Sequence, residues 1–143
     1  MPTAPGVAHN YHLNDRLNAL RAVLNVNHRL RLFKTPASGI DPSWTWTAFG
    51  ESTFPGYPLN GVPLDNDFGA SVQVVNGEFQ ISGTSHAFSF TSGSPENCYG
   101  WVITDSTPEV RFSYLFASPV WMTNGVTIYV QPIVQDWSYT VVP

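Results

Sequence analysis

The segment that decides the fold is residues 98–122, CYGWVITDSTPEVRFSYLFASPVWM, in which two aromatic-rich arms flank a short polar stretch. Side chains alternate between the two faces of a strand, so Tyr99, Trp101 and Ile103 are expected to share one face. Residues 105–108, DSTP, are turn formers. The segment therefore predicts a β-hairpin whose rings anchor the core. In its second arm the residues expected to share a face are Val110, Phe112, Tyr114 and Phe116.

Other short runs also show the alternation of strands. Residues 70–75 and 78–82 flank Asn76-Gly77, a pair typical of a tight hairpin turn. Trp44 and Trp46, two positions apart, are expected on one face of a short strand. About eight short strands joined mostly by turns predict a mainly β fold, an antiparallel β-sandwich or barrel. The remaining strands are expected at 29–33, 87–91 and 126–131.

The ends of the chain are expected to differ from this β body, which we place at 29–135 within one domain over 1–143. Residues 1–11 lack periodicity and are expected to be a flexible arm. Leucines spaced like one face of a helix predict a helix over 12–25. The segment 136–143 is an apolar tail that is expected to pack on the sheet or on a neighbour. The leucines of the helix are Leu13, Leu17, Leu20 and Leu24.

The composition is poor in charge and rich in aromatic residues. Charged residues make up 11% of the chain, against roughly 25% in an average globular protein, and aromatic residues make up 14%. Residues 1–34 hold five basic residues against one acidic residue, while the rest holds one against nine. A basic segment on an acidic body can dock on an acidic neighbour or simply be the solvated face of a helix. The acidic body disfavours nucleic-acid binding, and no apolar stretch predicts a membrane span, so we expect a soluble protein.

No motif predicts catalysis, a cofactor or a metal. Ser85-His86 lacks the backbone signature of a nucleophile, and the single Cys98 is expected to be a buried apolar residue. Asp65-Asn66-Asp67 resembles the start of a calcium loop, but the later ligand positions are missing, which favours a polar turn. A carbohydrate-binding module, with Trp44, Trp46 and Tyr57 stacking on sugars, remains an alternative.

The chain contains the segments LRLFK (30–34), FGESTFPGYP (49–58), GEFQISG (77–83), YGWVITD (99–105), VRFSYLFASPVWM (110–122) and NGVTIYVQP (124–132). In their order and spacing, these six segments resemble a family of small structural proteins of tailed phages. The resemblance implies a non-enzymatic capsid decoration or cement protein, made in the host cytoplasm and located on the capsid surface of the virion. It also implies the major capsid protein as a partner and a homo-oligomer, a dimer or a trimer; a tail- or fibre-associated protein is the nearest rival.

If this function is right, the hairpin is scaffold and the partner is contacted from elsewhere. The basic N-terminal segment, the tryptophan loop and the apolar tail are then the expected contact regions. The candidate partner-binding residues are Arg16, Arg21, Arg29, Arg31, Trp44, Trp46, Trp137 and Tyr139.

Overall fold

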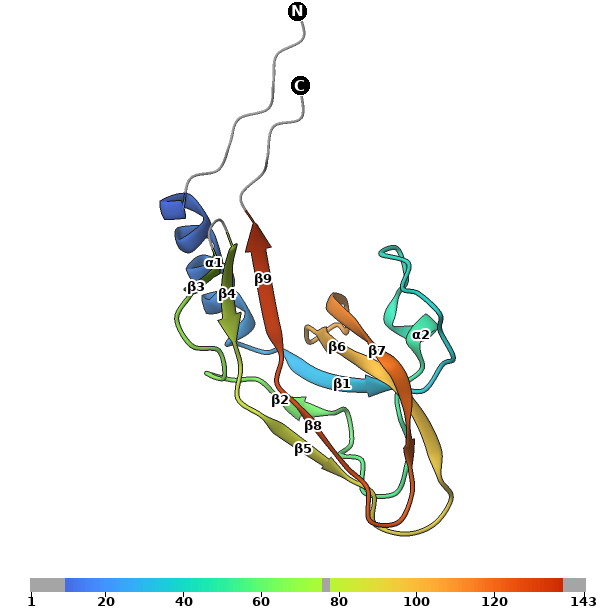
Figure 1. Cartoon of the computed structure of the whole chain (residues 1–143). Coiled ribbons are helices and arrows are strands. Elements are labelled where there is room, and N and C mark those ends of the chain that lie inside the picture. Colours follow the sequence, from blue (N-terminus) through green and yellow to red (C-terminus); the bar gives the residue numbers. More distant parts are fainter. Residues whose placement is uncertain (1–9, 76–77, 138–143) are drawn as a thin grey trace, which may run out of the picture.

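The structure is a computed structural model that describes residues 10–75 and 78–137. It is mainly β, with 40% strand and 12% helix. The strands of the described residues form three antiparallel sheets, and none of these sheets closes on itself (Figure 1). The mainly β, antiparallel class predicted from the sequence is confirmed.

The largest sheet has four strands in the order β2-β1-β6-β7. The predicted hairpin forms its outer half, since β6 and β7 pair along their lengths. Strand β1 lies between β2 and β6 and pairs antiparallel with both. The four strands are β1 (Arg29–Phe33), β2 (Val62–Pro63), β6 (Glu96–Thr104) and β7 (Val110–Met122).

The two smaller sheets, β3-β4-β9 and β5-β8, are joined end to end. Between them the Gly83 amide donates to the Pro132 carbonyl over 2.8 Å, so that two long chain segments run as one bent ribbon (Figure 1). A Cβ at Gly83 would lie 2.7 Å from the Pro132 ring, so the bend needs glycine. The predicted Asn76-Gly77 turn lies outside the described residues. The strands are β3 (Val72–Val75), β4 (Glu78–Ser82), β5 (His86–Ser89), β8 (Thr127–Val130) and β9 (Ile133–Trp137).

The hairpin carries an irregularity that the alternation of its sequence does not reveal. Cys98 pairs with Val120 and Gly100 with Leu115, so four residues of β7 lie opposite Tyr99 alone. Tyr99 consequently packs in a different cluster from Trp101. The prediction that Tyr99 shares a face with Trp101 and Ile103 is therefore wrong, because a bulge inverts the alternation.

A second register shift lies at the other end of the hairpin. Ile103 pairs with Phe112 and Thr104 with Val110, which leaves one extra residue on β7. Val110 accordingly packs with the second cluster, while Phe112 and Phe116 pack with the first. Val110 was expected on the face of Phe112, and the shift explains the difference.

Helix α1 (Asn10–Leu24) packs on β4 and β9. Of the predicted leucine stripe, Leu17 and Leu24 are each 1% exposed and Leu20 is partly buried, all three packed against the chain's own body. The helix begins earlier than expected, and Asn10 and Tyr11, assigned to the flexible arm, belong to it. At the other end Asp136 and Trp137, assigned to the apolar tail, belong to β9. The rest of both segments, 1–9 and 138–143, lies outside the described residues.

A second short helix, α2 (Trp46–Phe49), occupies the position where a strand was expected. Thr45 precedes it in an extended conformation, and Gly50 ends it with φ 67°. Figure 1 shows α1 and α2 at opposite ends of the molecule. The aromatic rings of this region pack around Phe49 instead of lining a strand face.

The four-stranded sheet is covered on both faces. Leu30 and Leu32 face the main core, which continues onto the ribbon and α1. On the opposite face, Phe33 packs with Phe49 under the loop that carries α2. Full burial of a Leu or Phe side chain stabilises the fold by about 1.5 to 3 kcal/mol. Burial of both faces also places Arg31, which lies on the Phe33 face, inside the protein.

Candidate functional site

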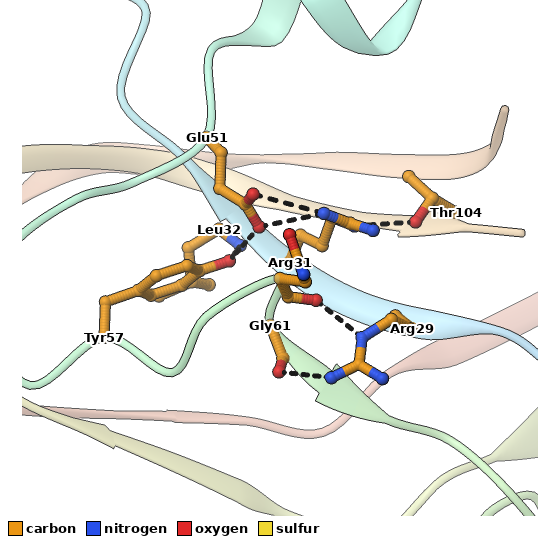
Figure 2. Close-up of polar contacts among 8 residues, drawn as sticks. Arg29, Arg31, Leu32, Glu51, Tyr57, Gly61 and Thr104 are labelled. Atoms are coloured by element: carbon orange, nitrogen blue, oxygen red, sulfur yellow. Dashed lines mark hydrogen bonds and ion pairs between the residues drawn. The ribbon is translucent and has the colours of Figure 1, made fainter. Parts of the chain in front are cut away.

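Arg31 is the central charged group of a polar site in which several side chains are joined by hydrogen bonds. Its side chain is only 8% exposed, because alternation along β1 directs it under the α2 loop. Nε donates to Oγ1 of Thr104 over 2.8 Å, and Nη1 donates to both carboxylate oxygens of Glu51 over 3.1 and 3.2 Å (Figure 2). The guanidinium also lies 5.4 Å from the ring centroid of Trp46, a cation–π distance. Arg31 is therefore held by contacts on several sides.

Glu51 reaches this position because its segment extends the edge of β1. It forms an isolated antiparallel bridge with Phe33, and the neighbouring Ser52 amide donates to the Leu32 carbonyl over 3.0 Å. The Tyr57 hydroxyl donates to Glu51 Oε2 over 2.9 Å and accepts from the Leu32 amide (Figure 2). Burial raises the pKa of Tyr57, so its hydroxyl stays neutral and keeps donating.

Arg29 lies next to this network and holds a turn against the start of β1. Its Nε donates to the Asn60 carbonyl over 2.7 Å and its Nη2 to the Gly61 carbonyl over 3.0 Å. A Cβ at Gly61 would lie 2.1 Å from the Leu30 carbonyl oxygen, which explains the glycine in the turn. Arg29 thereby closes one side of the site while its guanidinium remains at the surface.

Arg29, Arg31, Trp46 and Glu51 line one open pocket of about 480 Å³, which we call the arginine pocket. Asn60, Ser106 and Pro108 complete its wall. None of the hydrogen bonds among the described residues uses Nη2 of Arg31. With two guanidinium groups and one carboxylate, the lining carries a net positive charge. Such a pocket is suited to bind a carboxylate or a similar anion beside an aromatic wall.

The structure thus brings together three of the candidate residues, Arg29, Arg31 and Trp46, and separates the others. Arg16 and Arg21 lie on α1 and do not line the arginine pocket. There Nε of Arg21 donates to the Phe68 carbonyl over 2.9 Å, which ties the helix to a loop.

The remaining candidates lie close to the arginine pocket or near the end of the chain. Trp44 packs edge-on against Phe49 at 5.4 Å and lines a neighbouring pocket of about 280 Å³. Trp137 is the last residue of β9. Tyr139 lies outside the described residues.

A second concave region, not expected from the sequence, lies between the β6–β7 hairpin and the β8–β9 segment. We call it the aromatic groove; its volume is about 440 Å³. Trp101 and Tyr114 had been assigned to the core, yet Tyr114 is 52% exposed and stacks on Trp101 at this groove. The sequence contains a signal for this groove, because alternation along the predicted strand 126–131 places Tyr129 and Gln131 on the face opposite the buried residues. Its lining residues are Trp101, Tyr114, Phe116, Tyr129, Val130, Gln131, Ile133 and Gln135.

The Asp65-Asn66-Asp67 segment serves as a polar turn. Asp65 accepts a hydrogen bond from the Asn27 amide. Asp67 lies 3.1 Å from Nε2 of His86 and accepts from the Thr84 hydroxyl, so it ties this turn to the bend of the ribbon. Within residues 10–75 and 78–137, no three His, Cys, Asp or Glu side chains gather closely enough to hold a metal ion.

Comparisons with known proteins add no further information about this geometry. No family model matches the sequence, and neither a curated protein nor a solved structure matches it. Among the described helices, none has the length and apolar character to cross a membrane.

Proposed function

We propose that this chain is a virion structural protein of a tailed phage that binds the assembled capsid as a cement protein. The observation that carries the proposal is the arginine pocket, where Arg29 and Trp46 surround the nearly buried guanidinium of Arg31. Arg and Trp are enriched among the residues that dominate binding energy at protein interfaces. The partner chemistry that fits is an acidic side chain of the major capsid protein, paired with the Arg29 guanidinium at the mouth of the pocket and beside the indole ring of Trp46.

The rigidity of the pocket supports a binding role. Arg31 is fixed by Thr104 and Glu51, and Arg29 by two backbone carbonyls, before any partner arrives. A partner that binds prearranged side chains does not have to order them, so less of the interaction energy is lost. A small β domain with such a pocket can bridge neighbouring capsid subunits and raise the temperature at which they separate.

The resemblance to tailed-phage structural proteins supports the capsid as the location, and a dimer or trimer is the proposed assembly. A tail- or fibre-associated role is the second candidate, in which the same pocket would contact a tail subunit. Imaging of the protein in a purified particle separates these two locations.

The test uses capsids that lack this protein. Adding the purified full chain is expected to give saturable co-sedimentation with the capsids and a higher temperature of capsid rupture. Absence of both binding and stabilisation would refute the proposal.

A pair of charge-matched variants tests the contact face. Arg29→Gln is expected to weaken capsid binding about ten-fold or more. Arg16→Gln removes the same charge from α1 and is expected to leave binding unchanged. Thermal unfolding of both variants checks that the fold is retained. If Arg16→Gln weakens binding and Arg29→Gln does not, the contact lies on α1 and the arginine pocket is not the capsid-binding site.

A further inference from the structure

We propose that the aromatic groove binds a neutral carbohydrate chain. This inference goes beyond capsid binding and does not depend on it, because the groove and the arginine pocket have no lining residue in common.

The ring arrangement in the groove is that of a platform for a flat, partly apolar ligand. Trp101 and Tyr114 stack with their centroids 5.8 Å apart and their planes at 20°. Trp101 is 8% exposed and Tyr114 is 52% exposed, so the buried indole fixes the orientation of an accessible phenol ring. Tyr129, on the facing segment, is 73% exposed. The C–H face of a pyranose ring is the kind of surface that stacks on such rings, with the phenol hydroxyls as polar handles.

Two amide side chains supply the hydrogen-bonding groups that sugar hydroxyls need. Gln131 and Gln135 are exposed on the β8–β9 segment, on the same side as Tyr129. Nε2 of Gln131 donates to the Gly83 carbonyl over 3.1 Å, and Nε2 of Gln135 donates to Oε1 of Gln80 over 3.4 Å. Within the part of the chain that the structure describes, each amide therefore keeps its second N–H and its oxygen for a ligand. An amide offers two donors and an acceptor oxygen, and the hydroxyl groups of a sugar both donate and accept. The groove thus combines aromatic faces with a small number of convergent polar groups, as small-ligand sites do.

The lining of the groove carries no charge, and this favours a neutral ligand. Every residue in its lining is uncharged at neutral pH, in a protein with a formal net charge of −4. An ionic ligand or a charged peptide would find no countercharge there, whereas a neutral polyhydroxylated chain needs none. The volume of about 440 Å³ lies within the range of about 300 to 1,000 Å³ that is usual for small-ligand sites.

The aromatic residues of the tryptophan loop, expected from the sequence to hold a sugar, are engaged elsewhere. Tyr57 stacks on Phe88 at 5.9 Å and meets Phe54 edge-on. Trp46 stacks on Phe49 and covers Arg31. The groove combines accessible aromatic faces with uncharged polar neighbours, so the structure favours it over the tryptophan loop as the location for a carbohydrate.

The test titrates the full chain with three neutral oligosaccharides, cellohexaose, fully N-acetylated chitohexaose and maltohexaose, each up to about 1 mM, by isothermal titration calorimetry. An array of immobilised neutral glycans extends the set of probes. We expect saturable binding of at least one probe, weakened about ten-fold or more by Tyr129→Ala. Tyr129 is largely exposed, so this variant is expected to fold, and its melting temperature checks that.

Trp121→Ala is the matched control. Trp121 lies on β7, has the same exposed fraction as Tyr114, 52%, and does not line the groove. We expect it to leave carbohydrate binding unchanged. No binding to any probe, or binding that survives both Tyr129→Ala and Tyr114→Ala, would overturn the proposal.

A second copy of the chain is the competing occupant, and the mass measured by light scattering identifies it. If Tyr129→Ala lowers the oligomeric state and no sugar binds, the groove is an interface between copies and the carbohydrate proposal is wrong. Capsid binding is measured in the same variants, so that a loss of carbohydrate binding can be distinguished from a loss of capsid binding. A groove variant that loses sugar binding is expected to retain its affinity for capsids.

Discussion

Replacing Glu51 with glutamine tests whether the buried ion pair holds the arginine pocket together. Glu51→Gln preserves the shape of the side chain but removes its charge. The carboxylate accepts two hydrogen bonds from Arg31 and one from Tyr57. The amide retains one acceptor oxygen and turns an NH2 group toward donors, so at least one of the three bonds is lost.

The size of the effect follows from the burial of the two partners. Removing one member of a fully buried ion pair typically destabilises a protein by about 3 to 5 kcal/mol, because an uncompensated charge stays inside. Here the Arg31 side chain is 8% exposed and the Glu51 side chain 22%, so water compensates part of the loss. We expect the free energy of unfolding to fall by about 2 to 3 kcal/mol. For a chain of 143 residues this corresponds to a melting temperature about 7 to 10 °C lower.

Urea unfolding followed by tryptophan fluorescence measures the change, with thermal unfolding as a second readout. Glu109→Gln is the control, because it removes an equal charge from an exposed position of the same protein. The control is expected to stay within about 0.5 kcal/mol of the wild type. If Glu51→Gln is as stable as Glu109→Gln, the ion pair does not hold the pocket and the reasoning is refuted.

Three further outcomes are expected. Gly100→Ala places a Cβ 2.0 Å from a carbonyl oxygen of β7, so it is expected to destabilise by about 2 kcal/mol or more, whereas Gly39→Ala, with nothing within 4 Å, is expected to be neutral; equal melting temperatures would contradict this. Hydrogen bonds from Thr107 hold the pKa of Asp105 below its usual range, so the stabilisation from this carboxylate is present above about pH 4 and is lost as the pH falls further. The unfolding free energy of Asp105→Asn is therefore expected to depend less on pH below about pH 4, and a slope equal to that of the wild type in urea titrations would argue against the contribution. Burial raises the pKa of Cys98 to about 11, so a thiol reagent at pH 8 is expected to leave the native protein unlabelled and to label one thiol per chain in urea; rapid native labelling would show that the thiol is accessible.

The parts of the fold that were predicted correctly depend on local patterns. The β6–β7 hairpin and the leucine face of α1 both repeat with the period of their own element, so a single stretch of sequence reveals them. The bulge at Gly100 was missed, because the need for glycine arises only from the packing of neighbouring strands, from the Tyr114 carbonyl on β7 and from the Phe33 ring on β1. A Cβ there would lie 2.7 Å from the ring of Phe33, which belongs to another strand.

Individual residues of the candidate site were predicted from the sequence, but the contacts that bring them together were not. Arg31 was assigned to a partner contact because its charge is visible, whereas its hydrogen-bond partners Glu51 and Thr104 are 20 and 73 positions away. Trp46 was placed on a strand because two tryptophans are two positions apart. That spacing also fits the extended approach and first turn of a short helix, which packing against Phe49 favours.

The aromatic groove was missed for a different reason. Aromatic residues in a hairpin are usually core residues, and Trp101 follows that rule with 8% exposure. Tyr114 stacks on it but lies on the outermost strand of the sheet, where packing is incomplete. Which ring of a stacked pair stays accessible depends on the order of the strands, and local sequence does not contain that order.

The bend at Gly83 and Pro132 couples the local unfolding of the two smaller sheets, β3-β4-β9 and β5-β8. Strands β4 and β5 are nearly continuous along the chain, and so are β8 and β9, so separating one pair pulls directly on the other. Backbone amides on both sides of the bend should therefore exchange with deuterium as one cooperative unit. Because α1 packs on β4, its amides should share this protection. A ligand that binds next to β8 would then slow deuterium exchange in α1, which packs at the other end of the ribbon.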